Sequence, residues 1–267
     1  MPSYPLHAVA FDLDGTLVDS LADLAAAANA MRQQRGLSPL SAARVQSFVG
    51  DGAPVLVART LADDPAAQVE ETAAQIKGRA AFAAAYAQGL ATHTRAYAGV
   101  AEALLTLSAQ GWPLAVITNK PIGFTQPLLQ QLGLASFFSV VLGGDSLPTK
   151  KPSPAPLAEV CRRWGIAPAA LLMVGDSHND ILAARAHGSP VVGIVDPFLD
   201  RPVPAGGLPA LQSNLLARCP VMIFATATLA ERYRAPFPAC LHRAPMLLPT
   251  RGNVLRSQLE QWFEEID

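Results

Sequence analysis

The sequence predicts an α/β protein with a Rossmann-like core, in which helices cover both faces of a parallel sheet to give three layers. Two observations support this fold class. After residue 93, short apolar runs alternate with helical segments, which is typical of a parallel sheet. Residues 20–90 contain several helix-forming segments and no strand pattern. We therefore expect an all-helical insertion between the first strand and the rest of the sheet.

The first strand is predicted over residues 8–11, an apolar run that leads into two aspartates, Asp12 and Asp14. Gly15 permits close backbone approach, and Thr16 can hold phosphate oxygens. If the two carboxylates converge where the strand turns into a loop, their repulsion favours a protonated carboxyl or a cation between them. Mg²⁺ is the usual cation where phosphate is also bound. An ordinary acidic turn after a buried strand is the alternative.

Four helices are predicted in the insertion. They cover residues 20–35, a segment that starts at Ser38 and Pro39, residues 54–61 and residues 65–88. Ser20 is expected to cap the first helix, because serine side chains accept hydrogen bonds from the free amides of a first turn. In the last helix, Val69, Ile76 and Phe82 recur roughly at helical spacing.

Strands and helices alternate through the second half of the chain. Strands are predicted over residues 113–117, 137–142, 171–174 and 191–195, and helices over residues 100–110, 121–132, from about 154, and 181–186. Polar residues follow these strands, namely Thr118, Asn119, Lys151, Asp176 and Asp180. Ligands of open α/β sheets bind at the carboxyl ends of the strands. Asp12, Thr118, Lys151 and Asp176 lie at or just past such ends and are therefore expected to share one crevice.

Composition narrows the possible partners. A formal net charge of -1 gives no general attraction to nucleic acid or to an anionic membrane, and a hydrophobic fraction of 51% is enough for a sizeable core. The start of the chain shows no secretory signal, and the apolar stretch over residues 9–17 contains two acids and cannot span a membrane. Three isolated cysteines fit a reducing cytoplasm. The oligomeric state is not predicted.

The four motifs resemble those of the haloacid dehalogenase superfamily of phosphotransferases. They lie at residues 12–16, 118–119, 151–152 and 175–180, and their order and spacing agree over residues 6–195. Residues 48–53, 117–121 and 143–145 look most like the bacterial phosphoglycolate phosphatases. The resemblance implies a catalytic core over residues 1–19 and 91–195 and a mobile helical cap over residues 20–90.

The activity implied is Mg²⁺-dependent hydrolysis of a small phosphate monoester, above all 2-phosphoglycolate to glycolate and phosphate. A carboxylate held in line with phosphorus and beside Mg²⁺ can form an aspartyl phosphate, and this role is expected for Asp12. Asp14 would act first as the acid for the leaving group and then as the base for water. Thr118 and Asn119 would donate hydrogen bonds to the phosphoryl group, and Lys151 would neutralise charge.

The resemblance also implies ligands for the metal and for the substrate. Asp12, Asp176 and the backbone carbonyl of Asp14 would bind Mg²⁺, with Asp180 nearby as a supporting or alternative ligand. Thr16 would bind phosphate. The loop of Gly50, Asp51 and Gly52 would face the substrate from the cap.

Each of these residues also has a simpler interpretation. Thr118 and Asn119 alone would be a polar strand exit, and Lys151 with Lys150 a solvated pair. Asp176 and Asp180 would serve as helix caps near Ser177, and residues 50–52 as a turn. His93 has no partner at a regular spacing and is expected to be structural.

Other activities of the same superfamily compete with this hypothesis. Dehalogenases lack the acid two residues after the nucleophile, so Asp14 favours phosphoryl transfer. A hexose-phosphate mutase and a phosphatase for another sugar phosphate use the same motifs. A non-catalytic binding protein on this fold is a third class, which the intact set of polar motif residues disfavours.

The resemblance ends after residue 195. Residues 196–267 contain scattered prolines, with a possible strand over residues 221–224 and a possible terminal helix over residues 254–266. Two hypotheses remain for this segment: a reading frame or gene end altered relative to the family, or a genuine added segment that packs on the core or on a partner.

Overall fold

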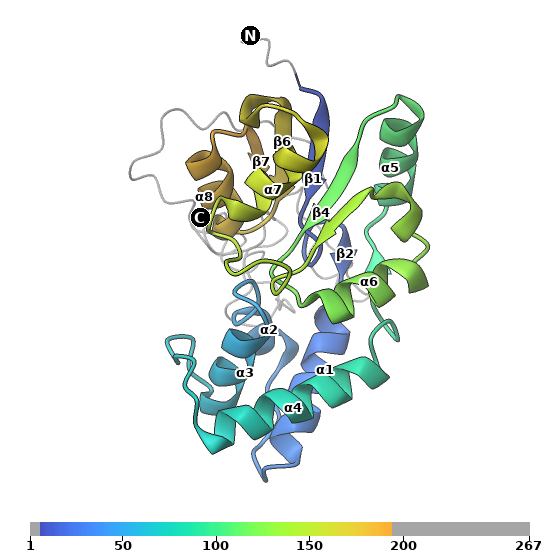
Figure 1. The fold of residues 1–267 in the computed structure, drawn as a ribbon. Helices are drawn as coiled ribbons and strands as arrows, with labels where there is room; N and C mark the ends of the chain where they lie inside the picture. The colour runs from blue at the N-terminus through green and yellow to red at the C-terminus, as the bar shows by residue number, and fades with distance from the viewer. Residues whose placement is uncertain (1–5, 194–267) are drawn as a thin grey trace, which may run out of the picture. The chain divides into compact units, whose positions relative to one another are not determined.

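The computed structural model describes residues 6–193 and places a five-stranded sheet at their centre (Figure 1). The strands run in the order β5-β4-β1-β6-β7, and each neighbouring pair is parallel. Their bounds are β1 Ala8–Phe11, β4 Leu114–Ile117, β5 Val140–Leu142, β6 Leu171–Gly175 and β7 Val191–Gly193. The predicted parallel α/β core is confirmed.

Helices cover both faces of the sheet, because alternate strand residues point to opposite sides. Val9, Leu114 and Val116 pack in one buried cluster with residues of α5 Val100–Ala109 and α6 Ile122–Gln131. The residues between them on the strands pack in a second cluster with α7 Ala155–Trp164 and α8 His178–His187. Figure 1 shows α5 and α6 on one side of the sheet and α7 and α8 on the other.

Four helices lie between residues 20 and 90, and no strand is described there. Their bounds are α1 Leu21–Gln33, α2 Ala42–Gln46, α3 Ala53–Ala62 and α4 Ala73–Gln88. Small residues let them pack closely: a Cβ added to Gly78 of α4 would lie 2.8 Å from Leu61 of α3 and 3.4 Å from Met31 of α1. None of the helices described in residues 6–193 is long and apolar enough to cross a membrane.

A short antiparallel ribbon connects this helical insertion to the core. β2 Val18–Asp19 pairs with β3 Arg95–Ala96, so the chain leaves the core and returns to it at adjacent points. These strands could not be predicted from the sequence, because two residues are too few to show an alternating pattern.

Several helix starts differ from the prediction. The second helix begins at Ala42 rather than at Ser38, since Ser41 supplies the cap by accepting a hydrogen bond from the Arg44 amide. The fourth begins at Ala73 after the Thr72 cap, which leaves residues 65–72 outside it.

The structure also differs from the sequence pattern in the fourth helix and at the start of one strand. Of the three residues noted for their helical spacing, Phe82 is buried, whereas Val69 and Ile76 are exposed, and Val69 lies before the fourth helix. The strand predicted from residue 137 begins at Val140, because the residues before it form a 3₁₀ turn, Ala135–Phe137. The strand and helix predicted within residues 196–267 lie outside the described residues.

Candidate active site

Asp12 lies where three strands end. The last residue of β1, Phe11, is opposite Val116 of β4 and Val174 of β6, so the loops after all three strands start at one level. The Asp12 amide continues this register by donating to the Val174 carbonyl at 2.9 Å. Parallel packing of the strands therefore brings the first, second and fourth sequence motifs to the same edge of the sheet.

The Asp12 side chain is buried and lies beside a buried cation. Its Oδ1 accepts a hydrogen bond from the Leu13 amide at 2.7 Å and lies 3.0 Å from Lys151 Nζ. Burial raises the pKa of Asp12 to about 7, and the Lys151 ammonium opposes this rise. The nearby carboxyls of Asp180 and Asp176 raise the pKa further, because like charges disfavour the anion.

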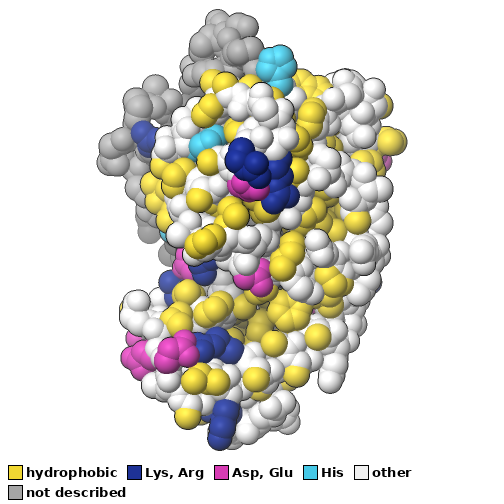
Figure 2. All heavy atoms as spheres, in the orientation of Figure 1, with side chains coloured by type: hydrophobic (Ala, Val, Ile, Leu, Met, Phe, Trp, Pro, Cys, Tyr) yellow, Lys and Arg dark blue, Asp and Glu magenta, His cyan; other side chains and the backbone are white. Residues whose placement is uncertain are grey.

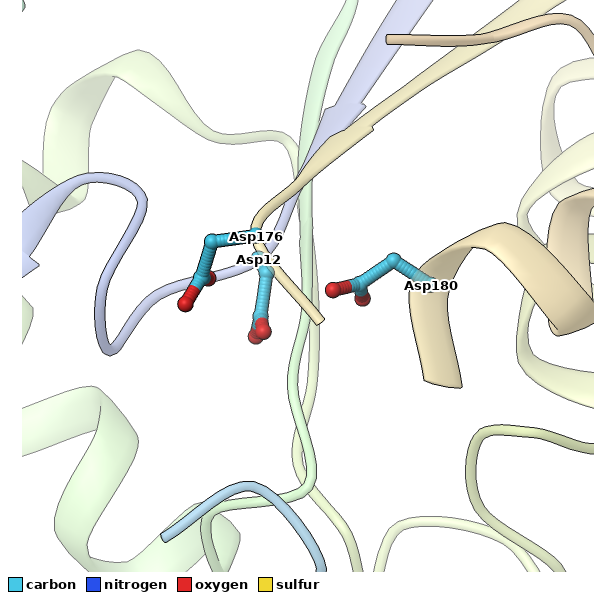
Figure 3. Close-up of side chains that lie close together, drawn as sticks. All are labelled: Asp12, Asp176 and Asp180. Atoms are coloured by element: carbon cyan, nitrogen blue, oxygen red, sulfur yellow. The ribbon is translucent and has the colours of Figure 1, made fainter. Parts of the chain in front are cut away.

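Three carboxylates form a cluster at this edge. One oxygen each from Asp12, Asp176 and Asp180 lies within 4.8 Å of the others. Figure 3 shows the three side chains approaching one another from two strand ends and from α8. Hard divalent cations prefer such oxygen ligands, and a cation among them would relieve the repulsion that raises the pKa of Asp12. The donor set thus suits a metal ion.

Two glycines make room for these carboxylates. A Cβ added to Gly15, whose φ is +84°, would lie 2.2 Å from Asp176 Oδ2. A Cβ added to Gly175 would lie 2.3 Å from Asp180 Cγ. The close backbone approach that sequence analysis expected at Gly15 is present, and Gly175 has the same role at the end of β6.

Asp180 has two other contacts within the fold. Its Oδ2 accepts from the Ser177 amide at 3.0 Å and from the Ser177 hydroxyl at 2.6 Å, which caps the first turn of α8. Its Oδ1 accepts from Lys151 Nζ at 2.5 Å. Asp180 is therefore both a helix cap and a member of the cluster, and the two interpretations from sequence are compatible.

Lys151 is held by three acceptors. Besides Asp12 and Asp180, its ammonium donates to the Ile117 carbonyl at 2.6 Å. Burial would lower the pKa of Lys151, but the two carboxylates outweigh burial and raise it above the ordinary value. Lys151 is therefore a fixed buried cation, and the interpretation of a solvated pair is wrong for it.

Asp14 lies outside the carboxylate cluster. Its carboxylate accepts from Ser20 Oγ at 2.5 Å and from Lys120 Nζ at 3.0 Å. Ser20 makes no side-chain hydrogen bond to α1, so the predicted capping role is wrong. Asp12 and Asp14 point to different partners, and the sequence did not predict Lys120 as one of them, although it follows Asn119 directly.

Lys120 also contacts the helical insertion. It is buried, and its Nζ lies 4.6 Å from the ring centroid of Tyr86 on α4. Burial would lower the pKa of Lys120, but Asp14 and Tyr86 outweigh it and raise the pKa. A residue of the core thus holds Asp14 while contacting the insertion.

Thr118 and Asn119 follow the end of β4, as predicted, and both are buried. Thr118 Oγ1 accepts from the Lys120 amide at 3.2 Å. Asn119 Nδ2 donates to the Gly50 carbonyl at 3.0 Å and to the Lys151 carbonyl at 2.9 Å. Both side-chain N–H groups of Asn119 are therefore used, so in this arrangement its side chain links two loops and does not offer a donor to a phosphoryl group.

The loop of Gly50, Asp51 and Gly52 contacts the core. Asn179 Nδ2 donates to Asp51 Oδ1 at 2.8 Å and to the Gly50 carbonyl at 3.3 Å. Arg59 of α3 pairs with the Asp51 carboxylate at 2.7 Å. The structure thus brings the predicted loop to the site. It adds Asn179, which sequence analysis placed inside the fourth motif without giving it a role.

Thr16 joins the same group of residues. Its hydroxyl donates to Asp176 Oδ1 at 2.7 Å, so it orients one member of the carboxylate cluster. A pocket of about 340 Å³ opens beside Lys151, between the core and the loop of residues 50–52. Figure 2 shows basic and acidic side chains side by side at an indentation of this face. A larger hollow of about 470 Å³ lies on the insertion and contains none of these residues.

Comparisons with known proteins find similarity over most of the described residues. A family model described as haloacid dehalogenase-like hydrolase matches residues 6–188. A phosphoglycolate phosphatase of Chromobacterium violaceum is 49% identical over 189 residues, which cover 71% of this chain and 85% of that protein. One of Neisseria meningitidis serogroup A is 50% identical over 189 residues, which cover 71% of this chain and 80% of that protein.

A solved structure shows the same similarity in three dimensions. The crystal structure of a predicted phosphoglycolate phosphatase from Haemophilus somnus is 41% identical in sequence, with a TM-score of 0.65. The match covers 71% of this chain and 85% of that one.

Proposed function

We propose that this chain, which belongs to the haloacid dehalogenase-like hydrolase family, hydrolyses 2-phosphoglycolate to glycolate and phosphate. The central observation is the buried Asp12 at a strand end, 3.0 Å from the Lys151 ammonium and grouped with two further carboxylates. The relatives named phosphoglycolate phosphatase, at 49% and 50% identity, support the choice of substrate. Their names do not favour a hexose-phosphate mutase.

Asp12 is the proposed nucleophile. Its oxygen attacks phosphorus and displaces the alkoxide of glycolate, so that a P–O bond to Asp12 forms as the ester P–O bond breaks. Lys151 lies beside that carboxylate and offsets the negative charge shared by the nucleophile and the phosphoryl group. Water then attacks the aspartyl phosphate, which releases phosphate and restores Asp12.

Asp14 is the proposed acid and base. It gives a proton to the departing alkoxide and later takes one from the attacking water. Ser20 and Lys120 hold its carboxylate away from the cluster that contains Asp12, so the two aspartates have separate positions for separate roles. Thr118 is proposed to donate a hydrogen bond to the phosphoryl group, as predicted from its place at the end of β4.

Mg²⁺ is the proposed metal. The carboxylates of Asp12 and Asp176 and the backbone carbonyl of Asp14 would hold it, with Asp180 in support, and it would offset negative charge on the phosphate. The four helices over residues 20–90 are proposed as the cap, and the loop of residues 50–52 as its substrate-facing part. The expected partner is a small phosphate ester, and the cytoplasmic location stays a prediction.

The test measures phosphate released from a series of phosphate esters with Mg²⁺. The chain is expected to prefer 2-phosphoglycolate, and Asp12→Asn should lower its turnover by about 10³-fold or more, because an amide oxygen is a poor nucleophile. Asp64→Asn changes an exposed carboxyl of the insertion and should keep full activity. Normal turnover by Asp12→Asn would refute the mechanism, and isomerisation of a sugar phosphate without phosphate release would favour the mutase.

A further inference from the structure

Lys150 directly precedes Lys151, and the proposed mechanism does not use it. It lies in the loop between β5 and α7, partly buried, and its Nζ donates to the Asp51 carbonyl at 2.6 Å. A Cβ added to Gly52 would lie 2.9 Å from this nitrogen. The missing side chain at Gly52 therefore leaves the space that the Lys150 ammonium occupies.

Three basic residues, Arg59, Lys150 and Lys151, are among those that line this pocket, and the buried side chain of Lys151 contacts the carboxylate cluster. Arg59 is paired with Asp51 at 2.7 Å, and Lys151 is paired with Asp12 and Asp180. Lys150 differs from both, because its bonded acceptor is a neutral carbonyl and no carboxylate within residues 6–193 forms an ion pair with it. It is the cation of this pocket whose charge lacks a direct counter-ion.

Burial makes this charge unfavourable. It lowers the pKa of Lys150, and the negative charge of Asp51 only partly opposes the effect. An anion that enters the pocket would compensate the ammonium and gain a charge-assisted hydrogen bond. Lys151, which lines the same pocket, contacts Asp12, so such an anion would bind close to the reacting phosphate.

We propose that Lys150 binds the carboxylate of the substrate's leaving group and thereby selects phosphate esters of small hydroxy acids. This inference rests on the proposed function and adds a specificity-determining residue to it. Lys151 neutralises the phosphoryl end and Lys150 the carboxylate end, so two adjacent lysines recognise the two charged ends of one small molecule. The pocket volume of about 340 Å³ is enough to admit a small phosphate ester.

The alternative is that Lys150 only ties the loop of residues 50–52 to the core through the Asp51 carbonyl. The two roles predict different results for a pair of substrates that differ only in the carboxylate. 2-Phosphoglycolate and ethyl phosphate are such a pair, since both have a two-carbon leaving group. A lost loop contact would impair both substrates, whereas a lost carboxylate partner impairs only the first.

The experiment compares kcat/KM for both esters in the full chain with Mg²⁺. Lys150→Met, which keeps the length and removes the charge, should lower kcat/KM for 2-phosphoglycolate by about 10- to 100-fold. It should leave the value for ethyl phosphate nearly unchanged. Lys150→Arg should restore much of the preference. The matched control is Lys77→Met, which removes an exposed charge from α4 and should change neither value.

Other outcomes separate this inference from the proposed function. An equal fall for both esters, or no fall for either, would refute the role of Lys150 while the wild-type preference for 2-phosphoglycolate stands. A wild-type preference for another carboxylated ester would refute the substrate, and loss of that preference in Lys150→Met would support the inference. Equal use of carboxylated and uncarboxylated esters by the wild type would refute both. Thermal melting of each variant checks that it is folded.

Discussion

Asp12 and Asp14 lie two positions apart, yet their carboxylates have different partners. Asp12 lies beside Lys151, whereas Asp14 binds Lys120 and Ser20. Lys150 and its neighbour Lys151 divide in the same way between a neutral carbonyl and two carboxylates. At the residue scale, the chemistry depends on the partner that each side chain contacts. Lys151 forms ion pairs with carboxylates, whereas Lys150, one position earlier, forms none within the described residues.

A buried carboxylate outside the carboxylate cluster also has a clear role. Asp23 of α1 accepts hydrogen bonds from the amides of His93 and Thr94, from the Thr94 hydroxyl and from His93 Nδ1. His93, for which the sequence showed no partner, thus has one 70 positions away. These contacts hold α1 against the segment that leads into β3, where the chain returns to the core.

Asp23→Asn is expected to lower the free energy of unfolding at neutral pH by about 1–3 kcal/mol, because an amide offers fewer acceptors to these donors. Burial opposes the charge of Asp23, but the hydrogen bonds from Thr94 and His93 outweigh it and lower the pKa. The stabilisation is therefore complete above the unfolded pKa of about 3.9 and is lost as the pH falls through the folded value.

Urea unfolding of both proteins from about pH 7 to about pH 3 measures this effect. The difference between wild type and Asp23→Asn should shrink as the pH falls. Asp19→Asn, at an exposed carboxyl of β2, should show little difference at any pH. A difference between wild type and Asp23→Asn that stays constant to the acid end would contradict the assigned hydrogen bonds.

At the scale of elements, the junction of β6 and α8 organises the cluster. β6 ends at Gly175, and α8 begins after Ser177 with a cap made by Asp180. This short turn places Asp176 and Asp180 on either side of Asp12 (Figure 3). The turn is tight because Gly175 has no side chain in the space that the Asp180 carboxyl fills.

Gly175→Ala is expected to lower the free energy of unfolding by about 1–3 kcal/mol and to weaken divalent-metal binding, because the new methyl group would overlap Asp180. Gly123→Ala is the matched control. That glycine lies in α6 with open space around its Cβ position, so alanine should stabilise the helix by about 0.5–1 kcal/mol. Unfolding and metal titration measure both effects, and equal stability of Gly175→Ala and wild type would contradict the steric role.

At the scale of the described molecule, the active-site residues come from both the sheet and the insertion. The loop of residues 50–52 receives hydrogen bonds from Asn119, Lys150 and Asn179 of the core. Tyr86 of α4 contacts Lys120, which holds Asp14. The insertion therefore adjoins both the proposed substrate pocket and the proposed acid and base.

Mg²⁺ is expected to raise the melting temperature of the whole chain, because a cation that binds only the folded carboxylate cluster stabilises that state. At about 100 times its Kd the gain is about 2.7 kcal/mol. Asp176→Asn should remove most of the shift, since it removes one of the three anions. Thermal melting with MgCl₂, and with NaCl at equal ionic strength, measures this. An equal shift with NaCl, or an undiminished shift in Asp176→Asn, would contradict the metal site.

The sequence by itself determined the α/β class, the helical insertion and most of the candidate residues at the strand ends. These features depend on apolar periods and on motifs within short stretches, and a parallel sheet brings its carboxyl ends to one edge whatever the details.

Only the tertiary structure decided the partners of these residues. Asp14 and Lys120 are 106 positions apart, and Asp51 and Asn179 are 128 apart. No local pattern encodes such pairs, since they form where separate elements pack. Packing also decided that Lys151 has carboxylate partners and Lys150 has none within the described chain, and that Asp14 stands apart from the cluster around Asp12.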